Sequence, residues 1–80
     1  MSKADRMFKK LGYEKEENEE EITYTIKDRW VLCFGKLFKE YYMHDYINDE
    51  LIGNSVSINM NEHLAIHEKL KELGWLDEKI

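Results

Sequence analysis

Two histidines, His63 and His67, stand four residues apart in the C-terminal part of the chain. On a helix this spacing puts both imidazole rings on one face, where they could bind one divalent metal ion with a third ligand from Glu62, Glu68 or His44. The pair lacks the glutamate of the HExxH metalloprotease motif, and histidines at a helix edge more often serve solvation or packing. A metal site, and a small metal-dependent enzyme built on it, therefore ranks last among the candidate functions.

Nucleophilic catalysis would need a serine or cysteine beside a positioned base. The single cysteine, Cys33, lies in the most apolar stretch of the sequence, where a thiol usually behaves as a small buried hydrophobic group. Ser55 and Ser57 are not surrounded by a Gly-x-Ser-x-Gly elbow, and the isolated glycines form no phosphate-binding loop. The sequence therefore predicts a protein that is not an enzyme and that needs no cofactor.

Basic and aromatic residues alternate through residues 27 to 46. This stretch holds more aromatic side chains than one sheet face can bury in a small domain, so part of the set should be exposed, although for any single residue the core is the better assignment. On a sheet, such side chains could form the centre of a protein interface or stack the bases of single-stranded nucleic acid. The residues expected to bind are Lys27, Arg29, Trp30, Lys36, Phe38, Lys39, Tyr41 and Tyr42.

Acidic residues gather in one patch. Residues 14 to 21 (EKEENEEE) carry the whole net charge of −5, because the remaining 11 Lys and Arg balance the remaining 11 Asp and Glu. The absence of a basic excess ranks a protein partner above nucleic acid. The patch could contact a partner, imitate a DNA backbone, or only solvate the surface. Its members are Glu16, Glu17, Glu19, Glu20 and Glu21.

Two helices are expected at the ends of the chain. The first covers about residues 3 to 11, with Ser2 as its N-cap and Gly12 suited to a left-handed C-cap. The second covers about residues 60 to 74, where Asn59 and Glu62 can form a capping box. The apolar residues with helical spacing are Ala4, Met7, Phe8 and Leu11 in the first helix, and the expected buried side of the second is Leu64, Ile66, Leu70 and Leu73.

Between the helices the hydrophobic period changes to two. Residues 21 to 27 alternate as a half-buried strand does, and residues 30 to 34 are apolar on both faces, which is typical of a central strand. Further strands are expected at 38 to 45 and, after a loop over 45 to 54, at 55 to 58. Residues 13 to 17 could add an edge strand, which gives four to five strands in all.

These elements predict one α+β domain over residues 1 to 80, in which an N-terminal helix, an antiparallel meander of four to five strands and a C-terminal helix follow one another. Both helices are expected on one face of the sheet, and a homodimer is the simplest cover for the open face. The sequence has one cysteine and no long apolar run, so we expect a cytoplasmic protein of a bacterial host with no membrane contact.

The two ends of the chain resemble a known group. Residues 4 to 15 (ADRMFKKLGYEK) and 58 to 75 (INMNEHLAIHEKLKELGW) are similar to small uncharacterised proteins of phages and prophages of Gram-positive bacteria. In that group an opening ADxMFxxLGY and a closing helix ending KELGW recur around a variable strand region. The resemblance implies a phage or prophage origin and assigns no catalytic residues. The expected function is a non-enzymatic protein-binding module of unknown target, with single-stranded nucleic-acid binding as the alternative.

Overall fold

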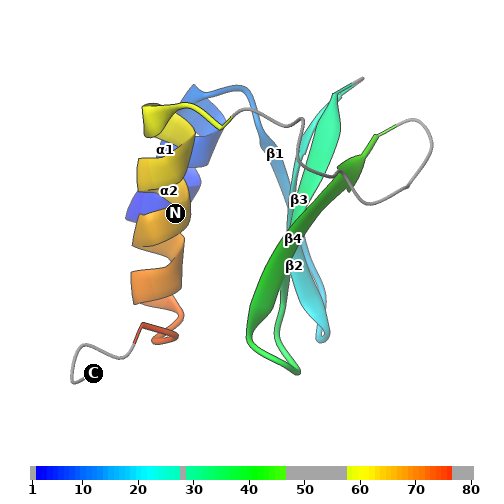
Figure 1. Ribbon diagram of the computed structural model, residues 1–80, viewed down its shortest axis with the longest axis vertical. Helices are drawn as coiled ribbons and strands as arrows, with labels where there is room; N and C mark the ends of the chain where they lie inside the picture. The colour runs from blue at the N-terminus through cyan, green and yellow to red at the C-terminus, as the bar shows by residue number, and fades with distance from the viewer. Residues whose placement is uncertain (1, 28, 47–57, 77–80) are drawn as a thin grey trace.

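The described residues of the chain form a four-stranded antiparallel sheet with two helices on one of its faces (Figure 1). The computed structural model describes residues 2–27, 29–46 and 58–76. Its elements follow the order α1 (Lys3–Lys10), β1 (Glu14–Glu17), β2 (Glu21–Ile26), β3 (Trp30–Gly35), β4 (Glu40–Asp45) and α2 (Met60–Glu72). The predicted α+β architecture is therefore confirmed, and the suggested edge strand is β1. The loop expected from residue 45 and the strand expected at 55 to 58 fall almost entirely outside the described residues.

Local capping chemistry fixes the helix ends. The Ser2 hydroxyl accepts a hydrogen bond from the Asp5 amide at the start of α1, and Asn59 and Glu62 form the expected capping box at the start of α2. Each helix is followed by a glycine with positive φ, +97° at Gly12 and +72° at Gly74. At such φ values a glycine carries no Cβ penalty, so both predicted helix stops are confirmed.

The buried side of α2 differs from the prediction at Leu64. Ile66 is buried and Leu70 and Leu73 pack against the core, but Leu64 is 46% exposed. The reason is that α2 contacts α1 in addition to the core residues of the sheet, so its buried side is turned toward α1. Lys69 and Glu62 are buried in consequence, each with polar partners from the N-terminal part of the chain.

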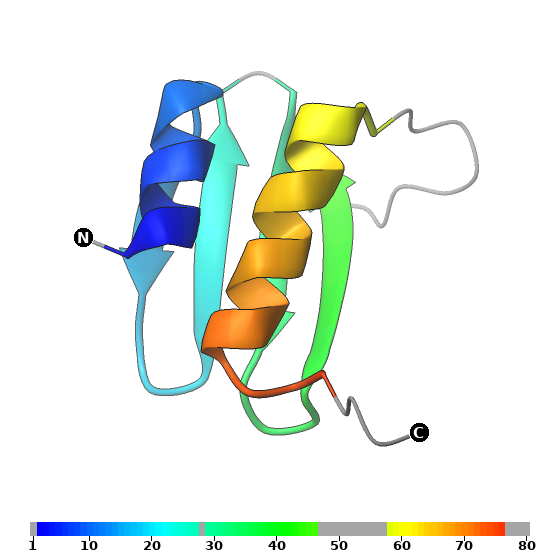
Figure 2. The same ribbon diagram turned by 90° about the vertical axis from the view of Figure 1, so that its left-hand side faces the viewer.

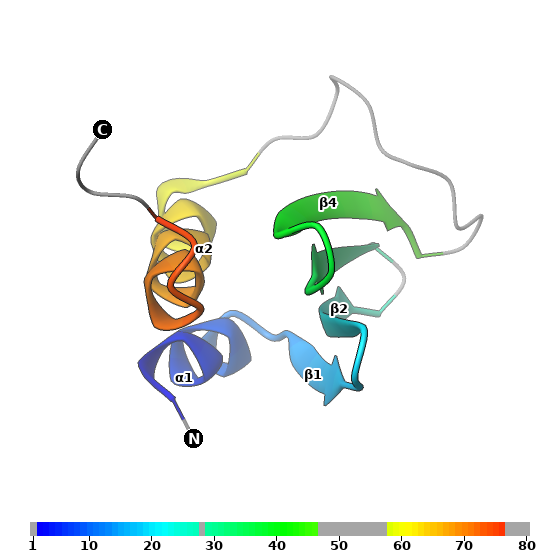
Figure 3. The same ribbon diagram turned by 90° about the horizontal axis from the view of Figure 1, so that it is seen from below.

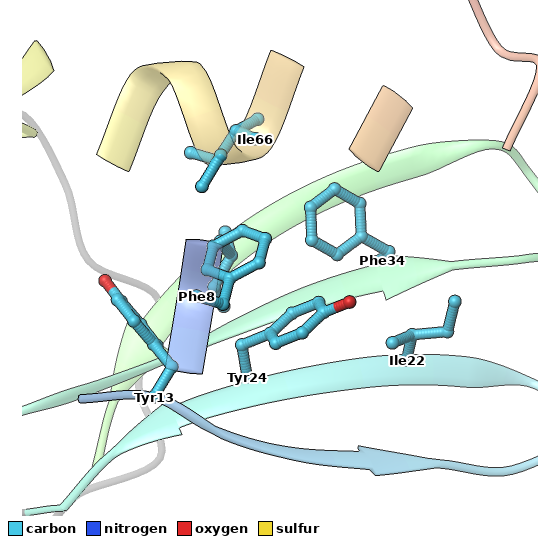
Figure 4. Close-up of a cluster of buried hydrophobic side chains, with 8 residues drawn as sticks. Phe8, Tyr13, Ile22, Tyr24, Phe34 and Ile66 are labelled. Atoms are coloured by element: carbon cyan, nitrogen blue, oxygen red, sulfur yellow. The ribbon is translucent and has the colours of Figure 1, made fainter. Parts of the chain in front are cut away.

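The core lies between the helices and one face of the sheet (Figure 4). Strand pairing sets Ile22 opposite Phe34 and Tyr24 opposite Leu32, and all four side chains are buried beneath the helices. The alternate positions of β2 and β3, such as Thr23 and Cys33, point to the open face. β3 is a central strand, as its two-sided apolar pattern predicts.

β4 begins later than the expected strand of residues 38 to 45. Residues 36 to 39 form the turn between β3 and β4, and Lys39 has a φ of +53°. A left-handed residue closes a tight hairpin but cannot continue a strand, so pairing starts at Glu40. Leu37 and Phe38 are thereby placed at the tip of the hairpin.

A partly buried polar cluster joins α1, α2 and the sheet. The Asp5 carboxylate accepts hydrogen bonds from Lys15 Nζ (2.8 Å) and the Tyr24 hydroxyl (2.6 Å), and Lys69 Nζ lies 3.4 Å away. Burial by itself would raise the pKa of Asp5, but the hydrogen bonds from Lys15 and Tyr24 and the charge of Lys69 lower it well below its usual range. Burial and the hydrogen bond to Asp5 raise the pKa of Tyr24 above its usual range.

Candidate functional site

The residues predicted to bind do not form one surface. Lys27 and Arg29 belong to the turn between β2 and β3, whereas residues 36 to 39 form the turn at the other end (Figure 2). Tyr41 and Tyr42 lie on opposite faces of β4, since Tyr41 pairs with the core residue Phe34 and Tyr42 pairs with Cys33 on the open face. The fold therefore divides the predicted set among several surfaces.

Trp30 is held by neighbours within the chain. Its indole Nε1 donates to the Tyr13 hydroxyl (2.8 Å), and the Arg29 guanidinium covers its ring at 4.1 Å from the centroid. The Tyr13 hydroxyl in turn donates to Glu62, and burial together with this bond raises the pKa of Tyr13 above its usual range. Trp30 thus helps to hold together β3, the chain before β1 and the start of α2.

The acidic patch is split by the pleat of β1. Glu16 pairs with Thr23 and so shares the open face, whereas Glu17 pairs with Ile22 on the helix side. Glu17 lies 2.9 Å from Lys36 Nζ and 3.4 Å from Lys15 Nζ. The hydrogen bonds from these two lysines lower the pKa of Glu17. The negative charge of Glu17 is therefore balanced by two lysines of the same chain.

Lys36 fastens the two hairpin turns at one end of the sheet to each other. Its backbone N–H donates to Glu20 O (2.8 Å), and its Nζ donates to Glu17 and to Asn18 O (2.8 Å). Asn18 also closes its own turn, because its side-chain oxygen accepts from the amides of Glu20 and Glu21. The two turns thus form one surface.

We call this the hairpin-end surface and define it as Glu19, Glu20, Glu21, Lys36, Leu37, Phe38 and Glu40, which line a shared depression. Leu37 is 80% exposed and Phe38 is 75% exposed, the highest values among the large apolar side chains of the described residues. In the part of the chain that the structure describes, none of the four glutamates forms an ion pair. The surface therefore combines an exposed apolar pair with excess negative charge.

The hairpin-end surface contains residues that the sequence analysis assigned to two separate predicted sites. Phe38 was predicted as a binding residue and Glu19, Glu20 and Glu21 as an acidic patch, and the meander brings them together. The sequence pattern does not mark Leu37 as a binding residue, because it predicts a strand over residues 38 to 45 and assigns residue 37 no role. The sequence feature that could have indicated the exposure of Leu37 is the tetrapeptide Lys-Leu-Phe-Lys directly after Gly35, because it places two apolar residues in a turn.

The two helix histidines share a groove, and no described residue completes a metal site with them. His63 and His67 line a groove of about 340 Å³ between α2 and β4, together with Tyr41 and Met60. His44 pairs with Val31 and so lies on the open face of the sheet, while Glu62 is bonded to Tyr13. Among the described residues, no cluster of three or more His, Cys, Asp or Glu could hold a metal ion.

Cys33 has a base beside it, which sequence reasoning missed. Its Sγ lies 3.3 Å from His44 Nε2, because the two residues are diagonal neighbours on β3 and β4. The register of the strands creates this pair, and no short sequence motif marks it. Cys33 is only 2% exposed, so its thiol is out of reach of a substrate in this conformation. Ser55 and Ser57 lie outside the described residues.

Comparison with known proteins gives no relative from which a function could be transferred. No protein-family model, curated protein or solved structure matches the chain. Within the described ranges, neither helix has the length and apolar character that crossing a bilayer requires.

Proposed function

We propose that this protein is a non-enzymatic protein-binding module and that the hairpin-end surface docks its partner. The observation that carries the proposal is the exposure of Leu37 and Phe38 beside four glutamates. Two large apolar side chains at the tip of a fastened hairpin are positioned to enter a pocket of another protein, because their turn is held by Lys36 before binding.

The charge around Leu37 and Phe38 indicates the kind of partner. Glu19, Glu20, Glu21 and Glu40 surround the apolar pair, and they would repel both a phosphate backbone and an anionic lipid surface. A protein surface with an apolar pocket bordered by Lys or Arg is complementary to this arrangement. The resemblance of both chain ends to phage and prophage proteins makes a Gram-positive bacterial lysate the source in which to search.

The first test removes the apolar pair. The double substitution L37S/F38S is expected to reduce capture of the partner at least about tenfold, since a hot-spot side chain that fills a pocket of the partner contributes about 2 kcal/mol or more to binding. Capture is measured by affinity purification from nuclease-treated lysate with quantitative mass spectrometry. The matched control is L64S, which alters an exposed apolar residue on α2. Equal capture by the wild-type protein and L37S/F38S would refute the proposed surface.

A second test reverses the charge of the same surface. The double substitution E19K/E20K is expected to reduce capture of the same partner, whereas E14K/E16K changes the net charge equally on β1 and should retain it. Omitting the nuclease tests the alternative function. A partner that is recovered only with intact nucleic acid, and lost steeply with added salt, would replace protein binding with single-stranded nucleic-acid binding.

A further inference from the structure

In the sheet that the described residues form, β4 is an edge strand whose outer side carries backbone groups directed away from the sheet. The Tyr46 N–H donates to Arg29 O (3.2 Å), toward β3. Because backbone groups of successive residues alternate in direction, Tyr42 and His44 also face β3, whereas the N–H and C=O groups of Tyr41 and Met43 face outward. Among the described elements nothing pairs with this outer edge (Figure 2). Such an edge is a template for another strand.

The sequence of β4 complements itself when it is read in the antiparallel direction around Tyr42. With Tyr42 opposite Tyr42 of a second copy, Tyr41 comes opposite Met43, and Glu40 comes opposite His44. Lys39, directly before the strand, comes level with Asp45. Aromatic residues thus meet apolar or aromatic ones, and acidic residues meet basic or imidazole groups.

The backbone directions agree with this register. Tyr41 and Met43 both point their N–H and C=O groups outward, so the two Tyr41–Met43 pairs can exchange hydrogen bonds between the copies. Tyr42 would form the pair without hydrogen bonds at the centre, where side chains of an antiparallel ladder are closest. A shift by one residue would place inward-facing groups opposite outward-facing ones and is excluded.

We propose that two copies of this chain pair β4 with β4 around a two-fold axis at Tyr42, and so form one eight-stranded sheet. The partner is a second copy because the strand is self-complementary in charge, in apolar character and in hydrogen-bonding direction. The β4–β4 interface shares Glu40 with the hairpin-end surface, but the variants that test it lie outside that surface.

The helix side of the molecule fits this arrangement. A two-fold axis perpendicular to the sheet keeps all helices on the same face, and α2 is the helix on the β4 side (Figure 3). The groove between α2 and β4, with the exposed residues Tyr41, Ile58 and Met60 on it, would then meet its copy. Two copies meeting through their open faces would instead bring together Glu14, Glu16, Glu21 and Glu40, which makes the edge the better interface.

The test places like charges at the axis. Y42K and Y42E each set two equal charges directly opposite one another, and each is expected to raise the dissociation constant of the dimer about tenfold or more. A one-to-one mixture of Y42K and Y42E is expected to restore the dimer, because position 42 then meets the opposite charge. Sedimentation equilibrium separates the 9.7 kDa chain from its dimer. T25K and T25E are the controls, since Thr25 lies on the open face of β2 and away from the edge.

Circular dichroism first shows whether each variant is folded. Should charges at position 42 prevent folding, Y42C in a C33A chain keeps the proposal testable, because the facing Cα atoms lie within disulfide range. Oxidised glutathione is then expected to link two copies, and T25C in the same background is expected to stay single. The proposal would be overturned if the wild-type protein were a monomer at about 1 mM, or if Y42K left the dimer intact. It would also be overturned if T25K dissociated the dimer, if the mixture of Y42K and Y42E stayed monomeric, or if Y42C failed to cross-link.

Discussion

Replacing Phe8 with alanine is expected to lower the free energy of unfolding by about 3–5 kcal/mol, the usual cost of truncating a buried phenylalanine. Phe8 stacks on Tyr24 at a centroid distance of 4.0 Å and meets Tyr13 edge-on at 5.3 Å and Phe34 at 6.4 Å. Its ring thus joins α1 to β2, β3 and the chain before β1 (Figure 4). Alanine would leave a cavity at the centre of the only core that the described residues form.

The size of this loss is large for the domain. A chain of 80 residues has a total stability of roughly 4–12 kcal/mol, so F8A should remove at least about a quarter of it. Urea unfolding followed by circular dichroism measures the difference from the wild-type protein. M7A is the control, because Met7 is only partly buried at the neighbouring position and should cost less than half as much. A cost for F8A below about 1 kcal/mol would show that this side chain does not hold the layers together.

Features that depend on neighbours along the chain could be predicted from the sequence. The caps at Ser2, Asn59 and Glu62 require contacts that span at most three residues, and Gly12 acts through its own φ angle. The alternation of Ile22, Tyr24 and Ile26 likewise depends only on the pleat of one strand. These local rules were sufficient for the element order and for the α+β class.

Features that depend on contacts between distant segments were predicted incorrectly or missed. The exposure of Leu64 follows from the contact between α1 and α2, which brings Lys69 to Asp5 across 64 residues of chain. The Cys33–His44 pair follows from the register of β3 against β4. The hairpin-end surface requires that two turns lie at the same end of the sheet, which only the complete meander determines.

The polar cluster between the layers should make the stability depend on pH through Asp5. D5N is expected to lower the free energy of unfolding by about 3 kcal/mol at pH 7, because it removes a charge on which Lys15, Lys69 and the Tyr24 hydroxyl converge. The Asp5 side chain is only 12% exposed, and in D5N a neutral amide, with one acceptor oxygen in place of two, would face the same partners.

The sign of the pH effect follows from the lowered pKa of Asp5. Folding favours the ionised carboxylate, so its contribution is present above the unfolded-state pKa of about 3.9 and is lost as the pH falls toward the lower pKa of the folded state. The stability difference between wild type and D5N should therefore be constant from pH 7 to about pH 5 and shrink between about pH 4 and pH 2. Urea unfolding at several pH values measures this difference.

E17Q is the matched control for D5N, because it removes an equal charge from the exposed ion pairs of Glu17. Exposed pairs contribute about 1 kcal/mol or less, so E17Q should change the stability little at any pH. A wild-type to D5N difference that stays the same from pH 7 to pH 2 would mean that lost packing, and not lost charge, causes the effect. The shrinking difference, by contrast, would assign the stabilisation to the ionised Asp5 that joins α1 to α2 and β2.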